Sequence, residues 1–192
     1  TTGIQNGFLL TRQVQDKRTG LAITLWLKTD TGPVKLEITN ELAVFFVELE
    51  QLETAKSILV NQRISLEKHQ VLSLKTFTQR DVAALYFTSM RSFYRARDAL
   101  KSQNIKCYED DIRPDDRFLM ERHITADIDY LGNHQLCGGY QLIKQAKCKG
   151  AAVKQQHSLT MLSIDIECSM QGELYSIGLY ANNNQKVFKR VL

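Results

Sequence analysis

Within residues 159–180, LTMLSIDIECSMQGELYSIGLY, two carboxylates stand two positions apart in a largely apolar segment. Successive side chains of a β-strand point to opposite faces, so Asp165 and Glu167 share one face, about 6 to 7 Å apart along the chain. Ile164 and Ile166 take the other face. Two divalent cations about 3.5 to 4 Å apart need several carboxylate oxygens, and this spacing suits such a site. The alternative is an edge strand whose acidic face is simply solvated.

The surroundings of the two carboxylates favour a folded sheet. The preceding residues are apolar enough for a central strand, where a charge needs a partner or a metal. The sequence predicts a turn at 169–172, a returning strand over 172–180 and a third strand over 185–192. Three antiparallel strands with carboxylates on the first resemble the opening of a ribonuclease-H-like nuclease domain.

Three blocks of the chain resemble family B DNA polymerases. The string SIDIECSMQGELYSIGLY is similar to their first exonuclease motif, especially in bacterial members. CYEDDIRPDDRFLMERHIT, residues 107–125, resembles the segment that closes their amino-terminal domain, and it ends 40 residues before Asp165. The opening GFLLTR, residues 7–12, is also similar. Separated blocks in the right order make the resemblance specific.

The resemblance implies a DNA-directed DNA polymerase with a 3′ to 5′ proofreading exonuclease, acting in DNA replication and repair. Asp165 would contact both of two Mg²⁺ or Mn²⁺ ions, and Glu167 would bind one ion and orient the attacking water. Cys168 departs from the family, which more often has threonine there. The other exonuclease carboxylates and the polymerase palm, fingers and thumb would lie beyond Leu192, so the chain alone is expected to be inactive.

The implied domains are a polymerase amino-terminal domain over 1–150 and the start of the exonuclease over 151–192. A glycine- and lysine-containing stretch, 125–156, is expected to be the linker between them. Implied partners are the DNA template and primer and the remainder of the polymerase. A sliding clamp would bind only a region outside this chain.

Composition restricts the other function classes. No apolar run reaches about 18 residues and the start lacks a signal peptide, so we expect a cytoplasmic protein without a membrane partner. Four irregularly spaced cysteines without a CxxC pair predict neither a disulfide framework nor a zinc site. A net charge of +4 permits nucleic-acid binding without requiring it.

The amino-terminal part is predicted to be α+β, beginning with a β-meander. Strands are expected over 7–15, 21–30 and 33–38, with Leu21, Ile23, Leu25 and Leu27 on one face. Trp26 falls on the other face, where it could stack on a base, although half-buried packing is the more frequent role.

A ferredoxin/RRM-like βαβ subdomain is predicted next. A strand at 44–49, a helix at 49–62 and a strand within 64–77 precede the clearest signal: a strand at 82–88, a helix capped by Ser89 and a strand at 105–109. Tyr86 and Phe87 are adjacent and point to opposite faces, so we expect the topology without base stacking. Basic residues of the helix could face phosphates, or form a solvated face with an intrahelical ion pair.

Pro114 predicts the first turn of a further helix, running to about His123. The acidic residues before and within that turn are expected to cap it and to pair with Arg113 and Arg117 rather than bind a cation. Two rival functions stay open: a non-catalytic nucleic-acid-binding module built from the meander and the βαβ unit, and a scaffold that positions template and nuclease.

Overall fold

The computed structural model describes residues 3–153 and 157–181. The chain divides into two compact units with the boundary between Lys154 and Gln155, and each unit is described by itself. Strands dominate both units and all helices of the described residues lie in the first, so the predicted α+β class is confirmed.

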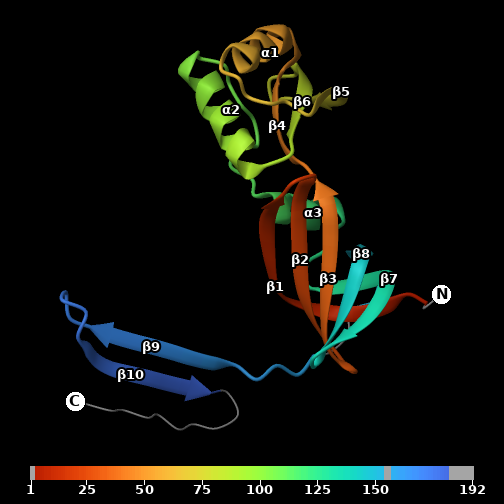
Figure 1. Cartoon of the computed structure of the whole chain (residues 1–192), viewed down its shortest axis with the longest axis vertical. Coiled ribbons are helices and arrows are strands. Elements are labelled where there is room, and N and C mark those ends of the chain that lie inside the picture. Colours follow the sequence, from red (N-terminus) through yellow and green to blue (C-terminus); the bar gives the residue numbers. More distant parts are fainter. Residues whose placement is uncertain (1–2, 154–156, 182–192) are drawn as a thin grey trace. The chain divides into compact units, whose positions relative to one another are not determined.

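The first unit contains a closed five-stranded barrel (Figure 1). Its strands are β1 (Gln5–Lys17), β2 (Gly20–Thr29), β3 (Gly32–Glu41), β7 (Asp127–Cys137) and β8 (Tyr140–Gly150). They follow the order β1-β2-β3-β8-β7, and β7 closes the barrel on β1. The β3–β8 pair is parallel and the other four pairs are antiparallel. The first three strands confirm the predicted meander.

The interior of the barrel is filled by the face predicted from alternation. Ile23, Leu25 and Leu27 are at most 1% exposed and lie in one cluster with residues of β3, β7 and β8. Helix α3 (Pro114–Glu121) adds Phe118 and Leu119 to the same cluster. Pro114 occupies the start of this helix, as predicted. The helix therefore packs onto the barrel core with its apolar side.

Residues 127–150 form β7 and β8, so the prediction of a linker over 125–156 is wrong for this stretch. Ile128, Tyr130 and Ile143 point into the barrel and are at most 3% exposed. The alternation that would have revealed the strands is interrupted by a register shift after Leu131 and by a positive φ of 50° at Gln145. Bulges of this kind shift the inward-facing residues by one position and disguise the period of two.

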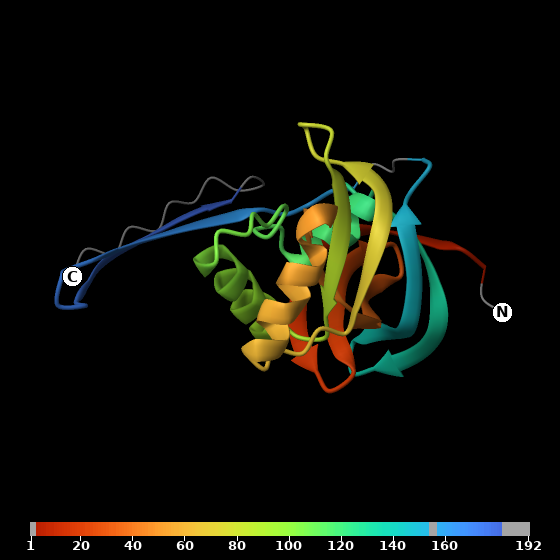
Figure 2. The same ribbon diagram turned by 90° about the horizontal axis from the view of Figure 1, so that it is seen from above.

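A second sheet with two helices is inserted between β3 and α3. Its elements are β4 (Ala43–Glu48), the 3-10 turn η1 (Leu49–Gln51), α1 (Leu52–Asn61), β5 (Lys68–Lys75), β6 (Asp81–Phe87) and α2 (Met90–Ser102). The antiparallel sheet has the order β4-β6-β5. Both helices pack on one face of it (Figure 2), around Phe45, Phe87 and Phe93. We call this part the inserted lobe, residues 43–108.

The inserted lobe confirms one predicted detail and corrects another. The Ser89 hydroxyl caps α2 by accepting a hydrogen bond from the backbone N–H of Ser92 at 3.1 Å. The strand predicted at 105–109 is wrong, because only Tyr108 pairs with β4, in an isolated antiparallel bridge to Phe46. Positive φ angles at Asn104 (60°) and Glu109 (54°) bend the chain on either side of this bridge.

The second unit is a hairpin of β9 (Leu162–Cys168) and β10 (Leu174–Ala181), as the sequence predicted. The third strand predicted over 185–192 lies outside the described residues. A search of the described residues finds no helix with the length and apolar character that a membrane crossing requires.

Candidate functional site

The turn of the β9–β10 hairpin is held by one serine. The Ser169 hydroxyl accepts hydrogen bonds from the backbone N–H groups of Gln171 at 3.2 Å and Glu173 at 3.0 Å. The backbone of Ser169 donates to the carbonyl of Glu173 at 2.8 Å, and its own carbonyl accepts from Gly172 at 3.0 Å. Gly172 has φ +88°, a conformation that favours glycine. These contacts fix the register of the two strands.

The register places both predicted carboxylates on the same face. Asp165 lies opposite Gly178, and Glu167 lies opposite Ser176. Their neighbours across the ladder are therefore small. A β-carbon added at Gly178 would lie 3.6 Å from the Asp165 β-carbon, an ordinary contact distance. The space beside the Asp165 carboxylate is thus unobstructed by β10.

The opposite face of the hairpin is apolar. Ile164 lies opposite Leu179 and Ile166 lies opposite Ile177. All residues of β9 are exposed, and Ile164 and Ile166 are each 57% exposed. Among the described residues, β9 has one sheet neighbour, which is β10. The hairpin thus separates an acidic face from an apolar face. Within the described residues β9 is exposed on both faces, so the burial expected of a central strand is not seen there.

The donor chemistry of Asp165 and Glu167 suits Mg²⁺ or Mn²⁺, because both ions prefer carboxylate oxygens. The number of donors is smaller than an octahedral ion requires. Within residues 3–153 and 157–181, no three or more His, Cys, Asp or Glu side chains are arranged so that they could hold a metal ion. The two carboxylates could hold an ion only together with further ligands.

The acidic residues near α3 form ion pairs with basic side chains, as predicted. Arg113 donates to Asp115 at 2.9 Å, and Arg117 donates to Glu109 at 2.6 Å. Asp110 forms an ion pair with Lys101 of α2. Each of these carboxylates thus has a basic partner. No side chain caps the N-terminus of α3, so the prediction of helix capping is wrong and ion pairing alone holds these acids.

The basic face of α2 is also partly neutralised. Arg97 forms the predicted intrahelical pair with Asp98 at 2.9 Å and lies 4.9 Å from the ring centroid of Tyr94. Arg95 donates to the carbonyl of Gln62 at 3.3 Å. These contacts agree with the interpretation of the basic side of α2 as a solvated face with an intrahelical ion pair.

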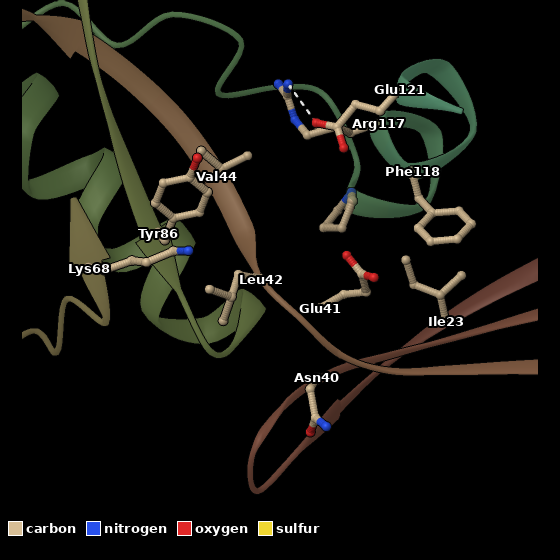
Figure 3. Close-up of a pocket in the computed structure, with 11 residues that line it drawn as sticks. Ile23, Asn40, Glu41, Leu42, Val44, Lys68, Tyr86, Arg117, Phe118 and Glu121 are labelled. Carbon is tan, nitrogen blue, oxygen red and sulfur yellow. Dashed lines mark ion pairs between the residues drawn. The ribbon is translucent and has the colours of Figure 1, made fainter. Parts of the chain in front are cut away.

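A cavity of about 300 Å³ lies between the end of β3, helix α3 and the inserted lobe (Figure 3). Glu41 and Arg117 line it from the barrel side, and Lys68 and Tyr86 line it from the lobe. The Lys68 ammonium lies 4.7 Å from the centroid of the Tyr86 ring. Burial raises the pKa of Glu41 above 4.5, while Arg122 opposes the shift and Glu121 adds to it.

Sequence reasoning missed this cavity. Its lining comes from five separate segments: Ile23, residues 40–44, Lys68 of β5, Tyr86 of β6, and α3. No spacing within any one segment marks them as neighbours. Only the insertion of the lobe between β3 and α3 brings them together.

Comparisons with known proteins agree with the sequence resemblance. Residues 7–41 match the family described as DNA polymerase II, N-terminal. The chain is 34% identical to DNA polymerase II of Escherichia coli (strain K12) over 175 residues, which is 91% of this chain and 22% of that protein. The chain therefore spans about a fifth of the length of that relative.

The fold matches a solved structure. The family B DNA polymerase from the hyperthermophilic archaeon Pyrobaculum calidifontis aligns with a TM-score of 0.70 and 16% sequence identity. The match covers 96% of this chain and 26% of that one. The sequence and family matches together show that the chain is similar to the N-terminal region of DNA polymerase II.

Proposed function

We propose that the chain is part of a DNA-directed DNA polymerase of family B with a 3′ to 5′ proofreading exonuclease, and that Asp165 and Glu167 belong to the exonuclease site. The observation that carries the proposal is the common face of these two carboxylates in the β9–β10 register, in a chain 34% identical to DNA polymerase II. DNA template and primer are the proposed substrates and partners.

The two carboxylates would hold Mg²⁺ or Mn²⁺, Asp165 shared between two ions and Glu167 bound to one. Bound ions of this kind activate water and stabilise charge on a scissile phosphate. The side chains supply the negative charge that holds the ions in place, and the small partners Gly178 and Ser176 leave their face open to a DNA end. Further carboxylates, from elsewhere in the polymerase, would complete the ligand set.

The first unit would serve as the polymerase amino-terminal domain, ending near residue 150, and would position DNA rather than cleave it. Its inserted lobe supports a ferredoxin/RRM-like assignment. Tyr108 bridges to the free edge of β4, so the order Tyr108-β4-β6-β5 is antiparallel throughout, with both helices on one face. On this proposal the 192-residue chain lacks nuclease and polymerase activity of its own.

The test is Mn²⁺-dependent cleavage of a single-stranded oligonucleotide by the longer polymerase that contains this chain. Asp165→Asn and Glu167→Gln remove charge with little change in shape, and each is expected to lower the cleavage rate by about 10³-fold. Primer extension by the same variants should stay near the parent rate.

The control is Glu173→Gln, which removes a carboxylate from the neighbouring turn of the same hairpin. It should cut as fast as the parent. Equal cleavage by the Asp165→Asn variant and the control would exclude the β9 carboxylates from the nuclease site. Cleavage by the 192-residue chain alone would contradict its proposed inactivity.

A further inference from the structure

The barrel has the topology of an OB-fold. Three meander strands are followed by a helix and a hairpin, β3 is parallel to the last strand, and the fourth strand closes on the first. Here α3 is the helix between the third and fourth barrel strands, and the inserted lobe precedes it. OB-folds bind oligonucleotides across the outer face of their second and third strands, which correspond to β2 and β3.

That outer face carries an aromatic pair. Trp26 of β2 and Tyr140, the first residue of β8, meet edge to face with ring centroids 5.0 Å apart. Their neighbours Leu25 and Leu27 point into the barrel and are fully buried, so Trp26 points outward. Both rings are half-buried, so part of each reaches solvent. Tyr140 follows directly on the β7–β8 turn, which is the loop that OB-folds add to this face.

A lysine lies beside the aromatic pair. Lys35 of β3 is the direct cross-strand partner of Trp26, and its ammonium lies 5.9 Å from the centroid of the Trp26 ring. Lys35 also pairs with Glu37 at 2.8 Å, with both side chains partly exposed. Exposed ion pairs of this kind contribute about 0 to 1 kcal/mol, so Lys35 can exchange Glu37 for a phosphate at little cost.

We propose that the β2–β3 face binds single-stranded DNA, with bases stacked on Trp26 and Tyr140 and a backbone phosphate at Lys35. Aromatic rings beside a cation are the combination that single-strand binding uses, because every base has a face to stack and every linkage carries a charge. The proposal rests on the proposed function in taking DNA as the partner, but it does not involve the carboxylates of β9.

Packing of the barrel core does not explain the position of the Trp26–Tyr140 pair. Trp26 contributes nothing to the barrel cluster of Ile23, Leu25 and Leu27. The aromatic pair sits on the outside of a barrel whose interior is already filled by aliphatic side chains. Trp26 therefore lies outside the barrel core, on the face where a base could stack on it.

The composition of the chain makes a direct test possible. Trp26 is the single tryptophan, so intrinsic tryptophan fluorescence reports on this face alone. Titration of the 192-residue chain with a 15-mer of dT is expected to quench that fluorescence, with the same midpoint as binding measured by anisotropy of a labelled 15-mer. Duplex DNA of equal length, whose bases are already stacked, should bind more weakly and quench less. A 15-mer of rU is the second probe, and a preference for it over dT would contradict the assignment to DNA.

The variants Trp26→Leu and Tyr140→Leu are each expected to weaken dT binding by at least about fivefold. Lys35→Ala should lower both the affinity and its salt dependence by about one phosphate contact. The matched control is Tyr94→Leu, which removes an exposed ring on α2 that likewise lies beside a basic side chain, Arg97. Circular dichroism and thermal unfolding identify any variant that fails to fold.

Binding that leaves the tryptophan signal unchanged, or that Tyr94→Leu weakens as much as Tyr140→Leu, would overturn the proposal. Absence of dT binding would overturn it as well. None of these outcomes bears on the cleavage test of Asp165 and Glu167. Failure of the binding proposal can therefore be distinguished from failure of the proposed nuclease site.

Discussion

Arg12 and Asp115 lie 103 positions apart in the chain and form an ion pair at 3.0 Å. The Asp115 side chain is 1% exposed, whereas that of Arg12 is 34% exposed. Arg113 donates to the same oxygen, Oδ2 of Asp115, at 2.9 Å. A carboxylate in the first turn of α3 thereby joins that helix to β1 of the barrel.

Removing this carboxylate is expected to destabilise the protein. Asp115→Asn would remove the buried anion that Arg12 and Arg113 share, leave them only the more exposed Asp116, and remove a favourable charge from a helix N-terminus. We expect the free energy of unfolding in urea to fall by about 2 kcal/mol. The control is Glu53→Gln, which breaks the Glu53–Lys56 pair where the carboxylate is 79% exposed. Glu53→Gln should lower the free energy of unfolding by less than about 0.5 kcal/mol. Equal losses in the two variants would show that the burial of Asp115 does not matter for stability.

Gly150 is predicted to be intolerant of any side chain. A β-carbon added there would clash with the carbonyl oxygen of His123, and the Gly150 N–H donates to the backbone carbonyl of Arg122 at 2.8 Å. Because that oxygen is backbone, Gly150→Ala must shift the end of β8, and we expect a loss of about 2 to 3 kcal/mol in the free energy of unfolding. Gly138→Ala is the control, since a β-carbon there meets no atom within 4 Å. Comparable melting temperatures for both variants would refute the close approach.

Two of the four thiols are predicted to resist alkylation. Burial raises the pKa of Cys107 and of Cys148 from 9.0 to about 11. The thiolate is the reactive form, so at pH 8 iodoacetamide should label the exposed Cys168 first and these two last. Mass spectrometry of digests would give the order.

The same thiols set a pH dependence of stability. Because the folded pKa exceeds the unfolded one, their contribution to the free energy of unfolding is full below pH 9 and is lost as the pH rises toward 11. Rapid labelling of Cys107 in the folded protein at pH 8, as fast as in urea, would contradict its burial.

Glu41 is predicted to titrate above 4.5, because burial raises the pKa of its carboxyl more than Arg122 lowers it. The protonated form is favoured by folding, so this group stabilises the protein toward low pH, and the contribution is lost as the pH rises through the folded pKa. Glu41→Gln should therefore leave the free energy of unfolding at pH 7 unchanged or raise it, unlike Asp115→Asn. Carbon-detected NMR titration would measure the midpoint. Arg122→Gln should raise the Glu41 pKa further, and a lower midpoint in that variant would contradict the assigned cause.

Local patterns in the sequence determined the elements whose neighbours are close in the chain. The alternation around Ile23, Leu25 and Leu27 predicted a buried strand face, because the pleat gives every strand a period of two. Ser89 predicted the start of α2, because its hydroxyl can accept from an N–H three residues later. The same period placed Asp165 and Glu167 on one side of β9.

The tertiary structure decided which strands meet. The parallel pair of β3 with β8 joins Val34 to Gln141, and nothing in either segment specifies a partner about a hundred residues away. Tyr140 lies in the stretch predicted to be a linker, so its contact with Trp26 could not be foreseen. Strand pairing depends on burying a common core, and bulges in β7 and β8 hid the pattern of that core. The sequence by itself thus determined the hairpin with its two carboxylates and the meander, whereas the closed barrel, its aromatic outer face and the Arg12–Asp115 pair exist only once distant segments pack together.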